Sequence, residues 1–473
     1  MALAAPAAYA QEVSRAAAPP KLWRRWLSSI APKSPALPEV PSPLREPARV
    51  WTRNESLARA LQANPDVQVA LVTVQRQDAV RLSSISSLLP HIGITASSDW
   101  RADSLIDRSA RELAEENLGA KLTPISTRGY NYQLQVSQNV FDGLASWHQV
   151  KRMALLQKKA SVDARELYLR IASQIRQAYD ATLLRQTMVV TRRDAVSDLA
   201  RLADVAKKRN AAGSIAQWES QRAESVLRSA EADLAQAEAE LARAQEAFCR
   251  MIYIEKPAGG LQLAGTIEPL EYREDFEVAF QRAQAGRLDL RSAQLQLDAA
   301  DMALRVAAGA WWPRIEAVAS YGVRSSYYDV QRENKGWSFG LSGRFDIFSG
   351  GQDVATRRVH RADRRIAEIR LAEVRRLIPS QIRELMVALD GSRKVMAANI
   401  SARDLAERSV REANKLFEQG SISSEVALNS EMAFRQARLN LLNAVYSNNV
   451  IIYQLDYITA NESFLDAVAP APR

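Results

Sequence analysis

The sequence predicts an α+β membrane protein built as a tandem repeat, and three observations support this fold class. Two stretches alternate apolar and polar side chains over about the 9 to 11 residues that a tilted strand needs to cross a bilayer. Long helical tracts separate these stretches, with only 18 Gly and 18 Pro among 473 residues. The same order of strands and helices then recurs, which is typical of a chain with a few very long elements.

The alternation is clearest in residues 130–140 and in residues 337–347. In both stretches one parity is apolar or aromatic, whereas the other carries mostly amide, hydroxyl, glycine or charged side chains. Successive side chains of a strand point to opposite faces, so one face of each strand is suited to lipid. We expect the lipid-facing residues to be Tyr132, Leu134, Val136, Phe339 and Leu341.

No window of the sequence offers 18 uninterrupted apolar residues, so we expect strands rather than a helix to cross the membrane. The single Cys249 excludes an internal disulfide framework and a cysteine-rich metal site. We expect this thiol to have a packing role.

The net charge of +9 does not indicate a nucleic-acid partner. The densest basic cluster, residues 357–376, contains Asp363, Glu368 and Glu373 among its arginines. Such interleaved charges are typical of a solvated helix face, and we expect no nucleic acid to bind.

Nothing in the sequence indicates an enzyme. His91, His148 and His360 have no metal-ligand spacing, and no nucleophile elbow, phosphate loop or dinucleotide fingerprint occurs. Residues 340–343 read Gly-Leu-Ser-Gly but lie within a predicted strand, without the turn that exposes a nucleophile. We therefore expect no catalytic residue, no cofactor and no metal.

The N-terminal segment, residues 1–50, leaves two questions open. Residues 1–10 end in an Ala-Tyr-Ala pattern, which fits either the remnant of a secretory signal or a disordered alanine-rich end. Residues 19–47 contain eight prolines and enclose Leu22, Trp23, Trp26 and Leu27, which could form a short interfacial anchor or pack against the body.

The body is a duplicated sequence. Pro90 and Pro313 lie in similar surroundings, which sets a numbering shift of 223, whereas short motifs further along repeat at a shift of 207. The difference between the two shifts is extra chain in the first copy, between Ser97 and Tyr130. Each copy reads helix, strand, loop, strand, long helix, tight turn and helix. The motifs at the shift of 207 are residues 139–143 with 346–350 and residues 213–215 with 420–422.

This organisation predicts five segments. They are an N-terminal extension (1–50), a first repeat (51–256), a linker (257–275), a second repeat (276–460) and a C-terminal tail (461–473).

The helices are unusually long. Residues 145–212 contain no internal Gly or Pro, and a helix of this length spans roughly 100 Å. In the next helix Leu227, Leu234, Leu241 and Phe248 recur with heptad spacing, which indicates coiled-coil packing. Pro379 interrupts the second long helix only, and we expect a kink there.

Four strands are predicted, at about residues 92–100, 130–141, 315–327 and 337–348. Four strands cannot close a membrane barrel, which starts at eight, so the chain must oligomerise. Some of the tryptophans near the strand ends are expected to form aromatic girdles, although a core role for some of them is the alternative. Trp147, Trp311 and Trp312 belong to one rim, and Trp100 and Trp337 to the other.

From residue 55 to residue 460 the chain resembles the TolC family of outer-membrane channels. The resemblance rests on the duplicated order of elements, the Asn64-Pro65-Asp66 opening, the Phe-x-Gly motifs at 141–143 and 348–350, and the Gly-Ser-Ile tips. It implies a homotrimer with a 12-stranded barrel in the outer membrane, continued into the periplasm by an α-helical barrel. It also implies a periplasmic adaptor and an inner-membrane pump as partners, either an ABC exporter or a proton-driven pump.

The two tips are the expected docking site for the adaptor, by this resemblance. Each glycine follows a long helix and precedes Ser-Ile, which predicts a left-handed cap with that serine as the next N-cap. The alternative is that the glycines only close the turns. The expected docking residues are Gly213, Ser214, Ile215 and Gln217 in the first tip, and Gly420, Ser421, Ile422 and Ser423 in the second.

Acidic residues can narrow the periplasmic entrance in this family. Glu219 keeps one acidic position in the first copy, whereas the two aspartate positions of the second copy carry Val426 and Asn429, with Glu425 beside them. The resemblance therefore carries neither an aspartate ring nor its ion selectivity to this chain. Glu219, Glu425 and Asn429 are the entrance candidates.

The cargo is the least constrained expectation. Channels of the drug-efflux branch often have an acylated N-terminal cysteine, and no cysteine lies near this N-terminus. This favours type I secretion of a protein toxin, with the outer-membrane component of a multidrug or metal efflux pump as the alternative. A periplasmic adaptor is a remote alternative, since it would have one hairpin between soluble β-domains and no paired amphipathic strands.

Overall fold

The computed structural model describes residues 50–102, 126–257, 259–325 and 335–461. The expectations for residues 1–49, for the extra chain at 103–125 and for the tail from 462 onward lie outside the described residues. The first copy comprises β1 (Val50–Trp51), α3 (Arg53–Ala63), α4 (Pro65–Ile85), η1 (Ser86–Leu88), β2 (His91–Ala102), β3 (Ser126–Phe141), α6 (Ala145–Ala211) and α7 (Gln217–Met251).

The second copy follows the short strand β4 (Gln262–Leu263). It comprises α8 (Phe276–Gly286), α9 (Leu288–Ala308), η2 (Gly309–Trp311), β5 (Arg314–Ser325), β6 (Lys335–Arg344), α10 (Gln352–Glu418) and α11 (Ser424–Ile458).

The two copies repeat each other element by element. Helices α6 and α10 each have 67 residues, α7 and α11 each have 35, and β2 and β5 each have 12. The long helices correspond at the numbering shift of 207, and the elements before the sheet correspond at the shift of 223. The predicted tandem repeat is therefore confirmed.

Two predicted boundaries are wrong. Each copy opens with two helices rather than one, because Asn64 and Arg287 adopt extended backbone and end α3 and α8. The Asn64 side chain accepts a hydrogen bond from the Asp66 amide at 2.8 Å and so caps α4. The fourth strand ends at Arg344, short of the predicted end at Phe348, because its partner β5 begins at Arg314.

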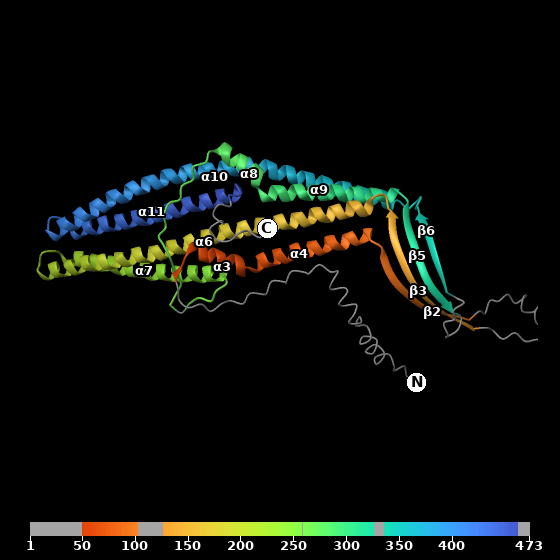
Figure 1. Cartoon of the computed structure of the whole chain (residues 1–473). Helices are drawn as coiled ribbons and strands as arrows, with labels where there is room; N and C mark the ends of the chain where they lie inside the picture. The colour runs from red at the N-terminus through yellow and green to blue at the C-terminus, as the bar shows by residue number, and fades with distance from the viewer. Residues whose placement is uncertain (1–49, 103–125, 258, 326–334, 462–473) are drawn as a thin grey trace, which may run out of the picture. The chain divides into compact units, whose positions relative to one another are not determined.

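The four long strands form one antiparallel sheet in the order β2-β3-β5-β6 (Figure 1). Directly opposed residues share a face, and the row through Ile94, Leu134, Tyr321 and Trp337 is apolar across all four strands. The adjacent row through Gln135, on the other face, is polar and includes a 2.7 Å hydrogen bond between the hydroxyls of Ser320 and Ser338. The predicted alternation thus produces one apolar and one polar face.

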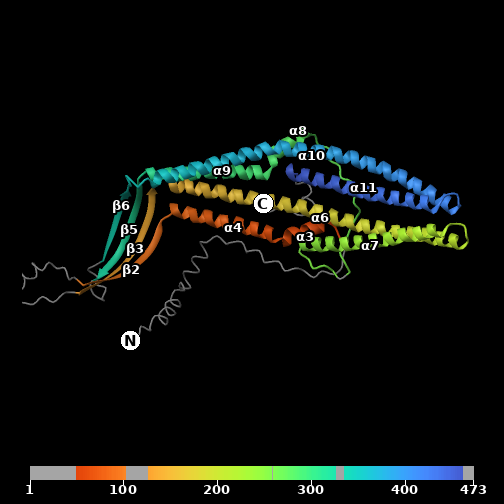
Figure 2. The ribbon, with the colours of Figure 1, turned by 180° about the vertical axis from the view of Figure 1, so that it is seen from behind.

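Long helices continue from the sheet and lie side by side (Figures 1 and 2). Helix α6 packs against α4 and α7 of its own copy and against α9 and α11 of the second copy. Helix α10 packs against α8, α9 and α11. No helix among the described residues is both long and apolar enough to cross a membrane.

Helix α10 runs through Pro379 without interruption. Ile378 and Ile382 are buried there against Ala279 and Ala283 of α8. Figure 1 shows that the ribbon of α10 changes direction beside α8, in agreement with the expected kink.

The largest core cluster surrounds the middle of α6. The segment that links the two copies packs there. Strand β4 pairs in parallel with β1, and the Tyr179 hydroxyl donates to the carbonyl oxygens of Trp51 at 3.1 Å and Ala264 at 2.7 Å. Trp51, Ile175 and Phe248 are fully buried in this cluster. The core therefore joins the first helices, the long helix and the linker.

Candidate functional site

The apolar face of the sheet carries the five residues expected to meet lipid. Tyr132, Leu134, Phe339 and Leu341 are exposed, and Val136 is half-buried. The strand register places Val136 opposite Ala319, which in turn lies opposite Phe339. The fold therefore brings the five residues, which lie on two strands far apart in the sequence, to one surface.

Aromatic side chains gather where the sheet meets the helices. Trp147, Trp311 and Trp312 are exposed, and the Trp312 ring meets Phe141 edge to face with 6.2 Å between centroids. The Lys151 ammonium lies 5.0 Å from the Trp147 ring centroid. At the other end of the sheet Trp337 is exposed, whereas the Trp100 side chain lies outside the described residues. Exposed indole rings beside a lysine are suited to a membrane interface.

A cavity of about 520 Å³ lies at the same junction, on the polar side of the sheet. His91, Asn139, Asp142, Arg314 and Glu316 line it together with residues of the helix ends. Burial raises the pKa of Asp142, but hydrogen bonds from Ser146, Asn139 and Ala145 outweigh this and hold the pKa below its usual value. Most of the residues that line this cavity have polar or charged side chains.

Each tip ends its long helix in the same motif. Gly213 and Gly420 have φ values of +71° and +80°, which confirms the predicted left-handed cap. The amide of Ser214 donates to the Arg209 carbonyl at 2.8 Å, and that of Ser421 donates to the Leu416 carbonyl at 2.9 Å. Such hydrogen bonds, which reach back across the glycine to the last helical turn, define a Schellman motif.

The predicted N-caps at Ser214 and Ser421 are wrong. Ala216 and Ser423 are the residues that precede α7 and α11, and neither makes a side-chain capping bond. The amides of Ser214 and Ser421 are already used in the Schellman bonds, which carries the chain further before the next helix begins. Ile215 and Ile422 are half-buried, and the other six expected docking residues are exposed.

The two hairpin tips of one chain are bound to each other. The Arg209 guanidinium donates to the carbonyl oxygens of Phe417 at 2.7 Å and Glu418 at 3.2 Å, and it lies over the Phe417 ring. Ser424 donates to Glu219 at 3.2 Å, and Arg222 pairs with Glu425 at 3.0 Å. Two of the three entrance candidates, Glu219 and Glu425, therefore lie in contacts between the hairpins, and Asn429 is exposed outside them.

Sequence reasoning missed Arg209 and Arg222. Their positions in the second copy carry Leu416 and Asn429, so neither arginine belongs to the repeated pattern. The difference between the copies could have identified them, because the first copy has a charged residue beside its tip at two positions where the second copy has none.

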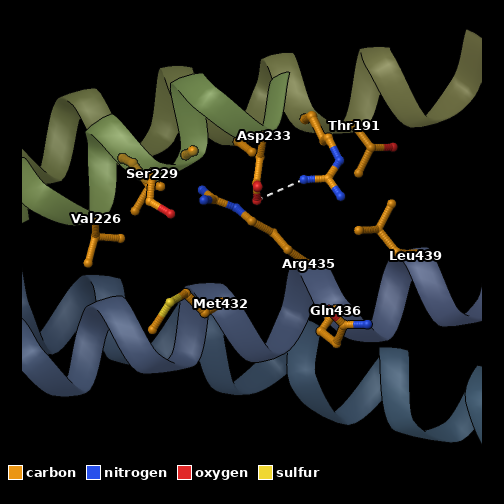
Figure 3. Close-up of a pocket in the computed structure, with 12 residues that line it drawn as sticks. Thr191, Val226, Ser229, Asp233, Met432, Arg435, Gln436 and Leu439 are labelled. Atoms are coloured by element: carbon orange, nitrogen blue, oxygen red, sulfur yellow. Dashed lines mark ion pairs between the residues drawn. The ribbon is translucent and has the colours of Figure 1, made fainter. Parts of the chain in front are cut away.

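Above the tips, a cavity of about 280 Å³ separates the hairpin of α6 and α7 from α11 (Figure 3). An ion pair of 2.8 Å joins Arg192 to Asp233 along one wall, and Arg435 extends from α11 into the gap. Burial lowers the pKa of Arg435, whereas its 2.8 Å pairing with Glu431 favours the charged form. The two hairpins are thus held together at the tip and separated by a partly polar gap above it.

Comparison with known proteins identifies the family. The family model described as "Outer membrane efflux protein" matches residues 57–252 and 279–458. No curated protein is similar enough in sequence to add a functional comparison.

Solved structures of outer-membrane channels share the fold. The CusC structure has a TM-score of 0.73 at 17% identity and covers 91% of this chain and 99% of its own. The CmeC channel of Campylobacter jejuni has a TM-score of 0.76 at 16% identity, with coverages of 86% and 85%. The open state of the MtrE channel of Neisseria gonorrhoeae has a TM-score of 0.68 at 17% identity, with coverages of 86% and 88%. The chain belongs to the outer membrane efflux protein family, the TolC-like channels that its sequence resembles, and is a non-enzymatic outer-membrane channel protein with a periplasmic helical extension.

Proposed function

We propose that three copies of this chain form one closed channel, which is the exit duct of a tripartite export system. The observation that carries this proposal is the four-stranded sheet: its edge strands, β2 and β6, have no further partner among the described strands, and one of its faces is apolar. Unpaired strand edges are not tolerated in lipid, and eight strands are the least that close a membrane barrel. Three copies supply twelve strands, the number that the family resemblance implies.

The polar face then lines the lumen. This face carries Gln133, Gln135, Ser320 and Ser338, and it lies on the other side of the sheet from the apolar face. A polar interior and an apolar exterior are the arrangement of water-filled outer-membrane barrels. The helices continue this duct into the periplasm.

The periplasmic partner is proposed to be an adaptor protein that docks at the six tips of the trimer. Support comes from the exposure of Ser214, Gln217, Ser421 and Ser423, which leaves these side chains accessible to a second protein. An inner-membrane pump, either an ABC exporter or a proton-driven pump, completes the proposed system. In this arrangement the chain itself supplies the passage, and the pump supplies the energy.

The family description favours efflux, and we propose small solutes as the cargo. Type I secretion of a protein toxin stays a prediction that nothing in the fold tests. Deleting the gene for this chain separates efflux from type I secretion. One measurement is the accumulation of a fluorescent cationic dye in the cells, and the other is the amount of large secreted protein in the medium. Raised dye accumulation with normal secretion supports efflux, and the reverse supports type I secretion.

The assembly is tested by the mass of the detergent-purified protein and by its conductance in planar bilayers. We expect a trimer that conducts ions. A well-folded monomer with native β content would contradict the proposal.

A further inference from the structure

The first turns of α6 carry a single exposed stripe that is mostly basic. The exposed side chains among residues 145–165 are Trp147, Lys151, Lys158, Ser161 and Arg165. Residues with this spacing lie on one side of a helix. The stripe begins next to the sheet, where α6 packs beside the end of α9 (Figure 1).

This stripe lies on the side of α6 that points away from the polar face of the sheet. Gln149 lines the cavity on that polar side. Because a helix turns by about 100° per residue, Trp147 and Lys151 each lie about 160° around the helix axis from Gln149. Lys158 lies about 180° from it. The stripe is therefore on the same side of the molecule as the apolar face of the sheet.

The start of the stripe lies at the depth of lipid headgroups. The sheet of this outer-membrane channel occupies the hydrocarbon core, and the headgroup region on each side of that core is roughly 5 to 7 Å thick. Lys151 is six residues into α6, roughly 9 Å along the helix axis, and Arg305 is three residues before the end of α9, roughly 5 Å along it. Lys158, roughly 20 Å into α6, lies beyond the headgroups.

The Lys151 ammonium points towards the membrane. Helical side chains tilt towards the helix N-terminus, which for α6 is the end at the sheet. The ammonium accordingly lies 5.0 Å from the ring centroid of Trp147, one turn closer to the sheet. The indole ring and the cation therefore face the same interface.

The charge of Lys151 is not neutralised by a carboxylate among the described residues, whereas Lys159 of the same helix pairs with Asp163 at 2.6 Å. The repeat equivalent of Lys151 is Arg358, which is exposed and likewise has no carboxylate partner in the described part of the chain. Both copies thus keep an unpaired cation six residues into the long helix.

A second cation approaches from α9. Asp301 holds the Arg305 guanidinium at 3.0 Å and also pairs with Arg364 at 3.3 Å. Burial lowers the pKa of His148, and the charges of Arg305 and Lys151 lower it further. Both cations therefore lie close to one imidazole, which is neutral at pH 7. Three cations and one carboxylate leave this cluster with a net positive charge.

We propose that Lys151 and Arg305, with the Trp147 ring beside them, bind the phosphate of an anionic phospholipid in the periplasm-facing leaflet of the outer membrane. A zwitterionic headgroup compensates its phosphate with its own cation, whereas the phosphate of phosphatidylglycerol remains available to the protein. Cationic side chains beside an indole ring at this depth therefore favour the anionic lipid. The site lies within one chain, so it is independent of the proposed trimer, partners and cargo.

Lipid titration followed by native mass spectrometry tests the site in the detergent-purified protein. We expect phosphatidylglycerol to bind more tightly than phosphatidylcholine. Lys151→Gln and Arg305→Gln should each weaken phosphatidylglycerol binding about fivefold, the factor that one cation near a membrane surface supplies, and leave phosphatidylcholine binding unchanged. The charge-preserving variants Lys151→Arg and Arg305→Lys should retain the preference for phosphatidylglycerol.

Lys207→Gln is the matched control. Lys207 is an exposed lysine of the same helix but lies roughly 90 Å from its first residue, far from the membrane. We expect native phosphatidylglycerol binding in this variant. Glycerol phosphate, which has the headgroup but no acyl chains, should compete poorly with the lipid. Competition as strong as that of the lipid would indicate a site for free phosphate and overturn the assignment to a lipid.

Amine labelling gives a second measurement that needs no substitution. The native protein is placed in nanodiscs of phosphatidylcholine or of phosphatidylglycerol, and acetylation of each lysine is followed by peptide mass spectrometry. We expect phosphatidylglycerol to slow the labelling of Lys151 but not of Lys207.

Three results would overturn the lipid site. They are unchanged phosphatidylglycerol binding in Lys151→Gln and Arg305→Gln, equal weakening in Lys207→Gln, and equal labelling of Lys151 in the two lipids. Each of them would leave the channel proposal intact, because assembly and conductance are measured separately.

Discussion

Helices α6 and α10 have the same length and the same place in their repeats, yet their central residues have different surroundings. Asp180 of α6 is fully buried and accepts hydrogen bonds from Arg53 at 2.7 Å and from the Tyr453 hydroxyl at 2.7 Å. Its equivalent in α10 is Val387, which is 73% exposed. A charge is buried where partners arrive from both repeats, and an apolar side chain is left uncovered where only one repeat is present.

The turns that follow the second strand of each copy show the opposite case. Both turns contain the same kind of hydrogen bond, but the serine and the aspartate stand at exchanged positions. In the first copy the Asp142 carboxylate accepts from the Ser146 hydroxyl and amide. In the second copy the Ser349 hydroxyl donates to Asp353, at the same two positions. A hydrogen bond from a serine hydroxyl to an aspartate carboxylate therefore stabilises both turns, although the aspartate comes first in one copy and the serine first in the other.

The largest expected effect is on the buried charge that distinguishes the two long helices. Asp180→Ala should destabilise the protein by about 3 to 5 kcal/mol, because the buried Tyr453 hydroxyl and Asn449 amide both lose their acceptor and the partly exposed Arg53 loses its ion pair. Val387→Ala, the repeat-equivalent control, should cost about 0.5 kcal/mol or less in a dissociated chain. Thermal unfolding in detergent measures both, and equal losses would show that the two helices have similar surroundings.

The next effect concerns the two faces of the sheet. Leu134→Arg and its repeat equivalent Leu341→Arg should each cost about 2 to 4 kcal/mol if the residues lie near the bilayer midplane. Gln135→Arg, on the polar face, should be tolerated and should change the conductance. Refolding yield into lipid and single-channel recording separate the outcomes, and equal damage on both faces would mean that the membrane setting of the strand is wrong.

The exchanged turn residues predict a smaller, pH-dependent effect. Asp142→Ala should cost about 1 to 2 kcal/mol, because partly buried donors of Asn139 and Ser146 lose their acceptor. Since hydrogen bonding lowers the folded-state pKa of Asp142, its contribution is present above the unfolded pKa of about 3.9 and is lost as the pH falls through the lower folded value. Stability measured from pH 6 downward should decline less steeply below pH 4 in Asp142→Asn, and unchanged steepness would exclude this role.

At the tips, substitutions should alter export more than stability. Replacing Ser214 and Gln217, or Ser421 and Ser423, with tryptophan should change unfolding by about 0.5 kcal/mol or less, because the four side chains are exposed. We expect loss of export and of adaptor cross-linking with the trimer intact. Testing the two tips separately shows whether both copies dock, and normal export from both variants would mean that the tips only close the turns.

The smallest effect is expected at Cys249, whose repeat equivalent is Asp456. Burial, with Glu246 adding to it, raises the pKa of the Cys249 thiol to about 11, so the reactive thiolate is scarce at neutral pH. A maleimide reagent should not label the native protein and should label it fully after unfolding. Rapid native labelling would show that this core opens.

The sequence by itself determined the local features of this protein. Period-two alternation determined which face of β3 is apolar, and the positions of Gly213 and Gly420 determined the left-handed helix ends. The run without internal Gly or Pro predicted α6 as one continuous helix, and the duplicated motifs predicted that a second copy would follow. Each of these features depends on residues that are close in the chain, where side-chain direction and backbone preference act directly.

Only the tertiary structure decided which distant segments meet. Arg209 lies at a carbonyl 208 residues away, and Asp180 meets a hydroxyl 273 residues away. The end of β6 at Arg344 was decided likewise, because a strand exists only as far as a partner strand accompanies it, whatever its own alternation predicts. The hydrogen bonds and the burial of a segment depend on the neighbouring segment that the fold supplies, and the residues of the segment alone do not identify that neighbour.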